Sequence, residues 1–230
     1  MGQHILPGNP PIALTLKRSP RARRVSLRVS GVDGRVTLTL PRGISESQAI
    51  EFAHEKSNWL RSQLARRPDV ILVRNGVEVP VEGETRRISM ATGRRIQIDA
   101  RTLYIPGPQE RMAARTKSWL RTLARDRLAA ASDHYAARLD LPYSRITLRD
   151  TRSRWGSCSS SGGLSYSWRL ILAPPDVLRY VAAHEVAHLK EMNHSTAFWD
   201  VVERLMPDYR THRGWLRQNG TALHRYRFES

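Results

Sequence analysis

The feature that most restricts the fold of this chain is a pair of histidines, His184 and His188, which lie four residues apart. Small apolar residues surround the pair, and neither proline nor glycine interrupts residues 176–192. The stretch therefore predicts a helix, in which positions four apart lie on the same face. Both imidazoles can then bind one ion from the same side. Glu185 follows His184 by about 100° of helix rotation, so its carboxylate can reach a water molecule beside that ion without binding the ion.

A third ligand is needed, because a catalytic zinc ion has three protein ligands and keeps its fourth position for water. His194, six residues after His188, is the first candidate. The helix must stop for His194 to return to the ion, and Asn193 tolerates the left-handed backbone conformation that such a turn uses. Asp200 and Glu203 are alternative ligands on the next predicted helix. For Glu203 we favour another role, that of a carboxylate that orients a ligand imidazole.

A pattern of the form H-E-x-x-H can also arise by chance on an amphipathic helix. The two histidines would then be buried or solvated side chains without a metal ion. The third histidine at a workable spacing and the apolar faces of the helix favour a metal site over this interpretation.

Composition narrows the class of protein. A chain of 230 residues can bury a substantial core, as one domain or as two small ones. No stretch approaches the roughly 20 apolar residues of a membrane helix, and the first residues lack the apolar centre of a signal peptide. Cys158 is the single cysteine, which excludes an internal disulfide and suits a reducing compartment. We therefore expect a cytoplasmic protein without a membrane partner.

The charge of the chain bears on its partners. With 38 lysines and arginines against 21 acidic residues, the net charge of +17 favours acidic partners, and nucleic acid first. Only four of the basic residues are lysines, so 38 − 4 = 34 are arginines. Codon composition can also produce such an arginine bias. Nucleic acid is therefore one expected partner, beside a peptide or protein substrate.

Hydrophobic periodicity predicts a chain of mixed helices and strands. The predicted strands lie at residues 12–16, 24–29, 36–40, 70–73, 77–81, 87–90, 95–98, 103–105 and 146–149. The predicted helices cover residues 45–66, 109–139 and 195–206, besides the helix that carries His184. Pro106-Gly107-Pro108 is the clearest internal break. It suggests an N-terminal, antiparallel β-rich region at 1–107 with one helix and a C-terminal region at 108–230, although the two could also form one compact domain.

The segment before the histidine helix predicts two strands around the turn at Ser161-Gly162-Gly163. In the second strand, apolar residues alternate from Leu164 to Leu172, and the chain then leads into the helix. A strand in this position could border a cleft and pair with an extended peptide, or it could be part of a plain structural hairpin. The last residues, 220–230, resemble a basic tail with few anchors.

Several short motifs accompany the histidines in a fixed order. They are Arg154-Trp155-Gly156-Ser157-Cys158, Trp168-Arg169-Leu170, Ala173-Pro174-Pro175, Asn193-His194-Ser195, Phe198-Trp199 and Met206-Pro207-Asp208-Tyr209. Together with the strand at 23–28, they resemble the bacterial YgjP-like metallopeptidases, which are zincins similar to the SprT and WLM groups. The resemblance implies zinc bound by His184, His188 and His194, with Glu185 catalytic. It also implies an α+β, zincin-like catalytic region behind the β-rich N-terminal region.

The predicted function is therefore a zinc metallopeptidase in which Glu185 acts as the general base on a zinc-activated water. Tyr209 and His212 could stabilise an oxyanion, but we favour a packing role for both residues. Cys158 is expected to be a small buried side chain rather than a thiolate that approaches the zinc. The alternative is a nucleic-acid-associated protein, either a DNA-linked protease or a binding module with a structural zinc. Glu185 distinguishes a protease from the binding module, because a structural zinc site needs no carboxylate there.

Overall fold

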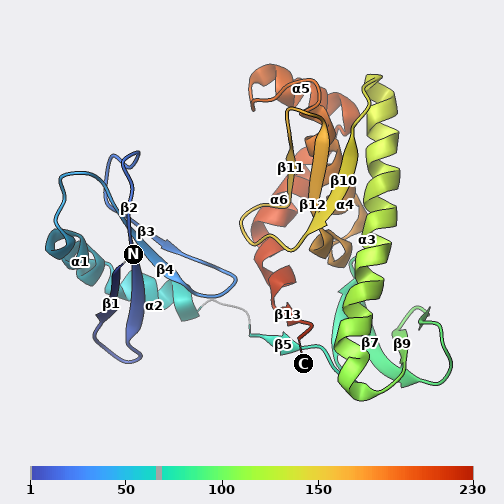
Figure 1. The fold of residues 1–230 in the computed structure, drawn as a ribbon, viewed down its shortest axis with the longest axis horizontal. Helices are drawn as coiled ribbons and strands as arrows, with labels where there is room; N and C mark the ends of the chain where they lie inside the picture. Colours follow the sequence, from blue (N-terminus) through green and yellow to red (C-terminus); the bar gives the residue numbers. More distant parts are fainter. Residues whose placement is uncertain (1, 66–68, 230) are drawn as a thin grey trace. The chain divides into compact units, whose positions relative to one another are not determined.

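The computed structural model describes residues 2–65 and 69–229, which fall into two compact units at residues 1–69 and 70–230 (Figure 1). Both units combine helices with strands, so the predicted α+β class is confirmed. The division differs from the expected one after residue 107. The strands before that residue share a core with the helices after it, as Val79, Ile88 and Leu103 belong to the same buried cluster as Leu120.

The first unit is a four-stranded sheet with two helices. Its strands are β1 (Gly2–Leu6), β2 (Ile12–Arg18), β3 (Ser26–Val29) and β4 (Val36–Leu40), and its helices are α1 (Glu46–Glu55) and α2 (Ser57–Ala65). The strand order is β1-β2-β4-β3, with β2 and β4 parallel and the other neighbours antiparallel. The sheet is therefore mixed rather than antiparallel, and β1 was not predicted. Alternate strand residues, including Leu14 and Leu38, pack with Ala49 and Leu60 of the helices.

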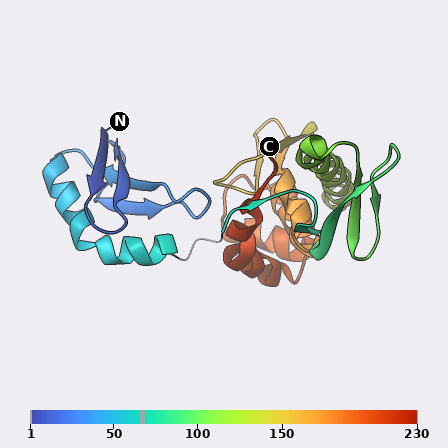
Figure 2. The ribbon, with the colours of Figure 1, turned by 90° about the horizontal axis from the view of Figure 1, so that it is seen from below.

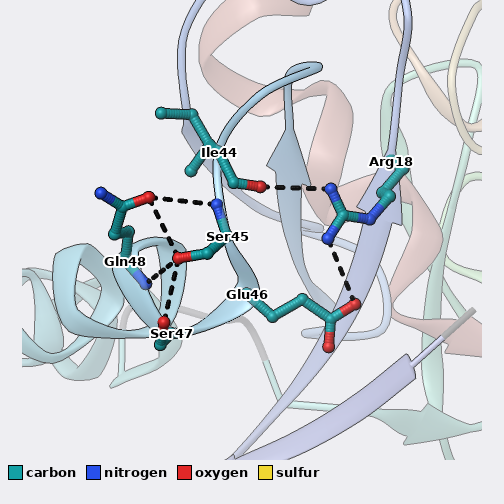
Figure 3. A network of polar contacts seen from close by, with 6 residues as sticks. All are labelled: Arg18, Ile44, Ser45, Glu46, Ser47 and Gln48. Atoms are coloured by element: carbon teal, nitrogen blue, oxygen red, sulfur yellow. Dashed lines mark hydrogen bonds and ion pairs between the residues drawn. The ribbon is translucent and has the colours of Figure 1, made fainter.

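The predicted start of the first helix is confirmed in detail (Figure 3). The hydroxyl of Ser45 accepts a hydrogen bond from the amide of Gln48 at 3.2 Å, and the Gln48 side chain accepts one from the amide of Ser45 at 3.1 Å. These two bonds satisfy amides that have no partner within the helix. Arg18 donates to the carbonyl of Ile44 and forms an ion pair with Glu46, which ties this helix end to β2. The expected single helix is interrupted after α1, and its expected end lies outside the described residues.

The second unit contains two larger sheets and a strand pair (Figures 1 and 2). The first sheet has the order β6-β7-β9-β8, from β6 (Glu78–Val81), β7 (Glu84–Ala91), β8 (Gln97–Ile98) and β9 (Thr102–Pro106). The second has the order β10-β12-β11, from β10 (Arg145–Arg149), β11 (Gly156–Cys158) and β12 (Gly163–Ser167). In each sheet one neighbouring pair is parallel, β7 with β9 and β10 with β12. The sheet of residues 78–106 is therefore mixed, not antiparallel as predicted.

The C-terminal residues are anchored, in contrast to the expected basic tail. β13 (Tyr226–Arg227) pairs in parallel with β5 (Ile71–Leu72), and a short 3₁₀ helix, η2 (Gly220–His224), precedes it. Leu223 and Phe228 belong to the main core. A strand pair between residues so far apart in sequence leaves no local pattern from which it could be predicted.

The long helix α3 (Gln109–Leu139) runs alongside α4 (Pro175–Ala187) and the β10-β12-β11 sheet (Figure 1). It was predicted with the same bounds. None of the helices in the described ranges is long and apolar enough to cross a membrane.

The predicted strand through Leu172 ends early. β12 stops at Ser167, and the next residues form a 3₁₀ helix, η1 (Trp168–Leu172), in which every residue is buried. The polar position Arg169 also points inward, where it donates to both carboxylate oxygens of Asp150 at 2.7 and 3.2 Å. Alternation of residue types therefore does not correspond to alternation of burial in this segment.

Candidate metal centre

Helix α4 presents the first two histidines. Pro175 lies in its first turn, and apolar residues such as Val181 and Val186 fix the helix in the core. The helix ends at Ala187, and His188 is the residue that caps it. His184 is partly exposed, whereas Glu185 and His188 are buried. The predicted helical placement of these side chains is thus confirmed.

The chain turns back directly after α4. The amide of Leu189 donates to the carbonyl of Val186, which continues the last helical turn by one residue. Asn193 was expected to provide a left-handed turn, but it is not among the described residues with positive φ. Instead its side-chain oxygen accepts a hydrogen bond from the amide of Ser195 at 3.0 Å. Ser195 in turn caps the next helix, α5 (Thr196–Leu205), so the turn is built by side-chain acceptors.

This turn brings His194 to the other two histidines. The Nε2 atoms of His184 and His194 lie 3.1 Å apart. One ring nitrogen from each of His184, His188 and His194 lies within 4.8 Å of the others. Two nitrogens bound at 2.0–2.1 Å to a tetrahedral ion would lie about 3.3 Å apart, so the observed spacing suits a shared ion.

Two further features prepare the imidazoles for a cation. The Nδ1 atom of His188 lies 2.9 Å from the carbonyl of Glu191, an acceptor that fixes the proton on Nδ1 and leaves the Nε2 lone pair free. Burial, followed by the charges of the other two histidines, lowers the pKa of His184 to about 3. Burial also lowers the pKa of His188. Both rings are therefore neutral near pH 7, as metal ligands must be.

Phe198 of α5 supports all three rings. Its ring centroid lies 4.9, 4.4 and 4.8 Å from those of His184, His188 and His194, respectively. Phe198 is fully buried, and Trp199 stacks on His194. Both aromatic residues therefore pack against the histidines.

Glu185 lies beside the histidines in an apolar setting. Burial raises the pKa of its carboxyl to about 8, while the charge of Arg154 acts in the opposite direction. Its side chain packs against the backbone of Gly156, where an added Cβ would lie only 2.4 Å from Oε1. The absence of a side chain at position 156 therefore gives the carboxylate its place. A carboxyl with a pKa near neutrality is suited to taking and returning a proton.

A cavity of about 570 Å³ opens over these groups. All three histidines and Glu185 line it, together with the strand β11. β11 is the edge strand of its sheet, whereas β12 lies in the middle. The strand that borders the cavity is therefore the one before the turn at Ser161-Gly162-Gly163. For the strand after the turn, the structure favours the second of the two interpretations left open, a structural hairpin with β11.

The remaining residues that the sequence suggested for the site are not metal ligands. The ligand group contains neither Asp200 nor Glu203, and Glu203 forms an ion pair with Arg210 at 2.7 Å. The expectation that Glu203 orients an imidazole is wrong. Tyr209 is buried, with its ring stacked on that of Trp199.

His212 lies 2.9 Å from a carboxylate oxygen of Asp208. Like Tyr209, it is not part of the cavity lining. Cys158 does line the cavity, and burial raises the pKa of its thiol, as does the charge of Glu185 to a lesser extent. It is half-buried, so the expectation of a fully buried side chain is met only in part.

Tyr180, which we did not predict from the sequence, lies one helical turn before His184 and lines the cavity. Burial raises its pKa to about 12, so the hydroxyl keeps its proton near neutral pH. No hydrogen bond contributes to that pKa, and the hydroxyl has no partner among the described residues. The spacing of four residues between Tyr180 and His184 was the one sequence pattern that could have placed Tyr180 on the same helix face as the ligand.

Comparison with known proteins assigns the chain to a family. Residues 23–219 match the model of the YgjP-like metallopeptidase domain. The chain belongs to the YgjP-like family. As a YgjP-like metallopeptidase it is a peptide-bond hydrolase that uses a divalent metal ion, and the match includes every residue of the candidate centre.

One solved structure similar to this YgjP-like chain is the metallopeptidase zymogen of Pyrococcus abyssi abylysin. The two are 22% identical with a TM-score of 0.36, and the alignment covers 40% of this chain and 92% of the other. No curated protein matches the chain.

Proposed function

We propose that this YgjP-like protein is a zinc-dependent peptidase, with His184, His188 and His194 as the zinc ligands and Glu185 as the general base. The observation that carries the proposal is the convergence of three ring nitrogens within 4.8 Å beside a buried carboxyl group in a cavity. A set of three neutral imidazoles is typical of zinc sites that keep one position open. A structural site would more often close with a fourth protein ligand.

Zinc bound by these ligands would polarise the scissile carbonyl and lower the pKa of a bound water towards ~7. Glu185 accepts a proton from the attacking water and later passes it to the leaving amine. Burial raises the pKa of Glu185 to about 8, which favours the protonated form that returns the proton. The charge of a bound zinc ion would lower this pKa and favour the carboxylate that accepts the proton. Gly156 fixes the carboxylate in place, because its backbone contacts the Glu185 side chain.

Tyr180 supplies a hydrogen-bond donor. Its phenol is neutral at pH 7 and unpartnered among the described residues, and it lines the same cavity as Glu185. We assign it the stabilisation of the developing oxyanion, in place of Tyr209 and His212. The edge strand β11 has one unpaired side, along which a peptide substrate could bind in an extended conformation.

The ligand assignment is tested by zinc content. His184→Ala or His188→Ala should abolish stoichiometric zinc binding, and His194→Ala should weaken it strongly, because two imidazoles hold zinc poorly. Glu203→Ala should keep full zinc, since Glu203 pairs with Arg210 instead. The opposite pattern, with zinc kept in His194→Ala and lost in Glu203→Ala, would refute the assignment of His194 as the third ligand.

The zincin fold, a cytoplasmic location and a nucleic-acid partner stay predictions from the sequence.

A further inference from the structure

Two arginines from one helix line the cavity beside the histidines. Arg213 and Arg217 lie four residues apart on α6 (Tyr209–Asn219), and therefore on the same face of that helix. Arg154, from the segment before β11, also lines the cavity. Among the cavity-lining residues Glu185 is the one acid, so the lining carries an excess of positive charge.

The partners of the basic residues on α6 separate them into two groups. Arg210 pairs with Glu203, and His212 lies beside Asp208. Arg213 and Arg217 line the cavity, and neither has a carboxylate partner among the described residues. The helix therefore pairs its basic side chains outside the cavity and leaves those inside it available.

The guanidinium of Arg213 is also held in position. It lies 4.5 Å from the ring centroid of Trp199, over the face of the indole. Trp199 itself stacks on His194, with 5.8 Å between the ring centroids. A cation–π contact of this kind restricts an otherwise flexible side chain, so the charge of Arg213 stays near the ligand imidazoles.

We propose that Arg213 and Arg217 form a subsite for a carboxylate of the substrate. The inference rests on the proposed peptidase function and names its substrate class: peptides with an acidic side chain, or with a free C-terminal carboxylate, close to the scissile bond. A guanidinium matches a carboxylate in shape and offers two parallel hydrogen bonds.

A phosphate group would also be attracted by these arginines, but the other residues that line the cavity favour a peptide. Apolar side chains of Trp155, Met192 and Leu216 share the cavity with the arginines. Its volume of about 570 Å³ suits a few residues of a peptide. Nucleic-acid binding, in contrast, depends on basic groups that follow an extended backbone.

The test measures binding apart from turnover. Zinc-loaded Glu185→Gln protein is titrated calorimetrically with acetylated, amidated hexapeptides of alanine and leucine. One Glu moves through every position, and each peptide has a Gln counterpart. A further peptide without Glu keeps a free C-terminal carboxylate, which distinguishes the two sources of the charge. We expect about tenfold tighter binding for Glu over Gln at one position or for the free carboxylate over the amide, which is about 1.4 kcal/mol.

The preference should be lost when Arg213→Gln or Arg217→Gln is added. Arg210→Gln is the matched control, because it removes the same charge from the same helix outside the cavity. An equal loss in the control would assign the preference to the net charge and overturn the subsite. Equal binding of Glu and Gln peptides at every position, including no binding at all, would also overturn it. So would tighter binding of a short oligothymidylate by the same two arginines.

Cleavage assays separate this inference from the proposed function. Zinc-dependent cleavage by the wild type without any carboxylate preference would refute the subsite alone. A carboxylate preference that depends on both arginines, without any cleavage by the wild type, would keep the subsite and refute the proposed hydrolysis.

Discussion

Gly156→Ala is the substitution that tests the position of the catalytic carboxylate most sharply. The added Cβ would lie 2.4 Å from Oε1 of Glu185, 2.6 Å from its Cγ and 2.7 Å from its Cδ. Ordinary contacts begin near 3.4 Å, so the carboxylate oxygen would have to retreat by about 1 Å. Glu185 is only 5% exposed, which leaves it little free space.

Gly156→Ala should lower the catalytic rate more than it impairs folding. A misplacement of about 1 Å in a catalytic group costs on the order of 10²-fold in rate. Overpacking of a buried contact costs about 1–3 kcal/mol of stability, which a well-folded domain tolerates. The zinc ligands are on other residues, so zinc content should be unchanged.

The assay is kcat/KM for peptide hydrolysis, with zinc content and thermal unfolding measured on the same samples. Gly214→Ala is the matched control, because an added Cβ there meets no atom within 4 Å. It should keep full activity. Wild-type activity in folded, zinc-loaded Gly156→Ala would refute the view that this glycine positions Glu185.

Three further predictions concern single side chains. Tyr180→Phe should lower kcat by about 10²-fold at unchanged zinc content, as loss of one oxyanion donor does, and unaltered kcat would exclude it from that role. Asp150→Asn should lower the free energy of unfolding in urea by about 2 kcal/mol, because it weakens the ion pair with the buried Arg169. Asp176→Asn is the control, since the ion pair of Asp176 with Arg179 is exposed, and it should change that free energy by no more than about 0.5 kcal/mol. The pKa of His184, about 3, lies below its ordinary value of 6.5, so the unfolded chain takes up the proton first. Metal-free protein should therefore lose stability as the pH falls below 6.5, and His184→Gln should lose less. Equal acid sensitivity of the two proteins in denaturant titrations would contradict this.

The sequence predicted the parts of the site that depend on local periodicity. The spacing of His184 and His188 and the apolar flanks were sufficient to place both imidazoles on one helix face, as observed. The same holds for the bounds of α3 and for the start of α1, where the observed Ser45 cap depends on residues three positions apart.

The features that the sequence did not reveal depend on contacts between distant segments. The inward position of Arg169 depends on Asp150 and on the carbonyls of Leu223 and Tyr226, which no local pattern connects to it. The contact between Gly156 and Glu185 joins a strand to a helix. Glu203 pairs with Arg210 because the chain turns between α5 and α6. In each case tertiary structure decides between arrangements that are equally consistent with the sequence.

Zinc-dependent catalysis by Glu185 can be measured as the rate of hydrolysis of a denatured protein substrate while zinc is added back to chelator-treated protein. Wild type and Glu185→Gln are compared in the same titration. We expect that both proteins bind one zinc ion, that hydrolysis by the wild type returns in proportion to bound zinc, and that the variant recovers about 10²–10⁴-fold less. Hydrolysis that persists without metal, or equal recovery by Glu185→Gln, would contradict the assignment of the three histidines and the carboxylate to this chemistry.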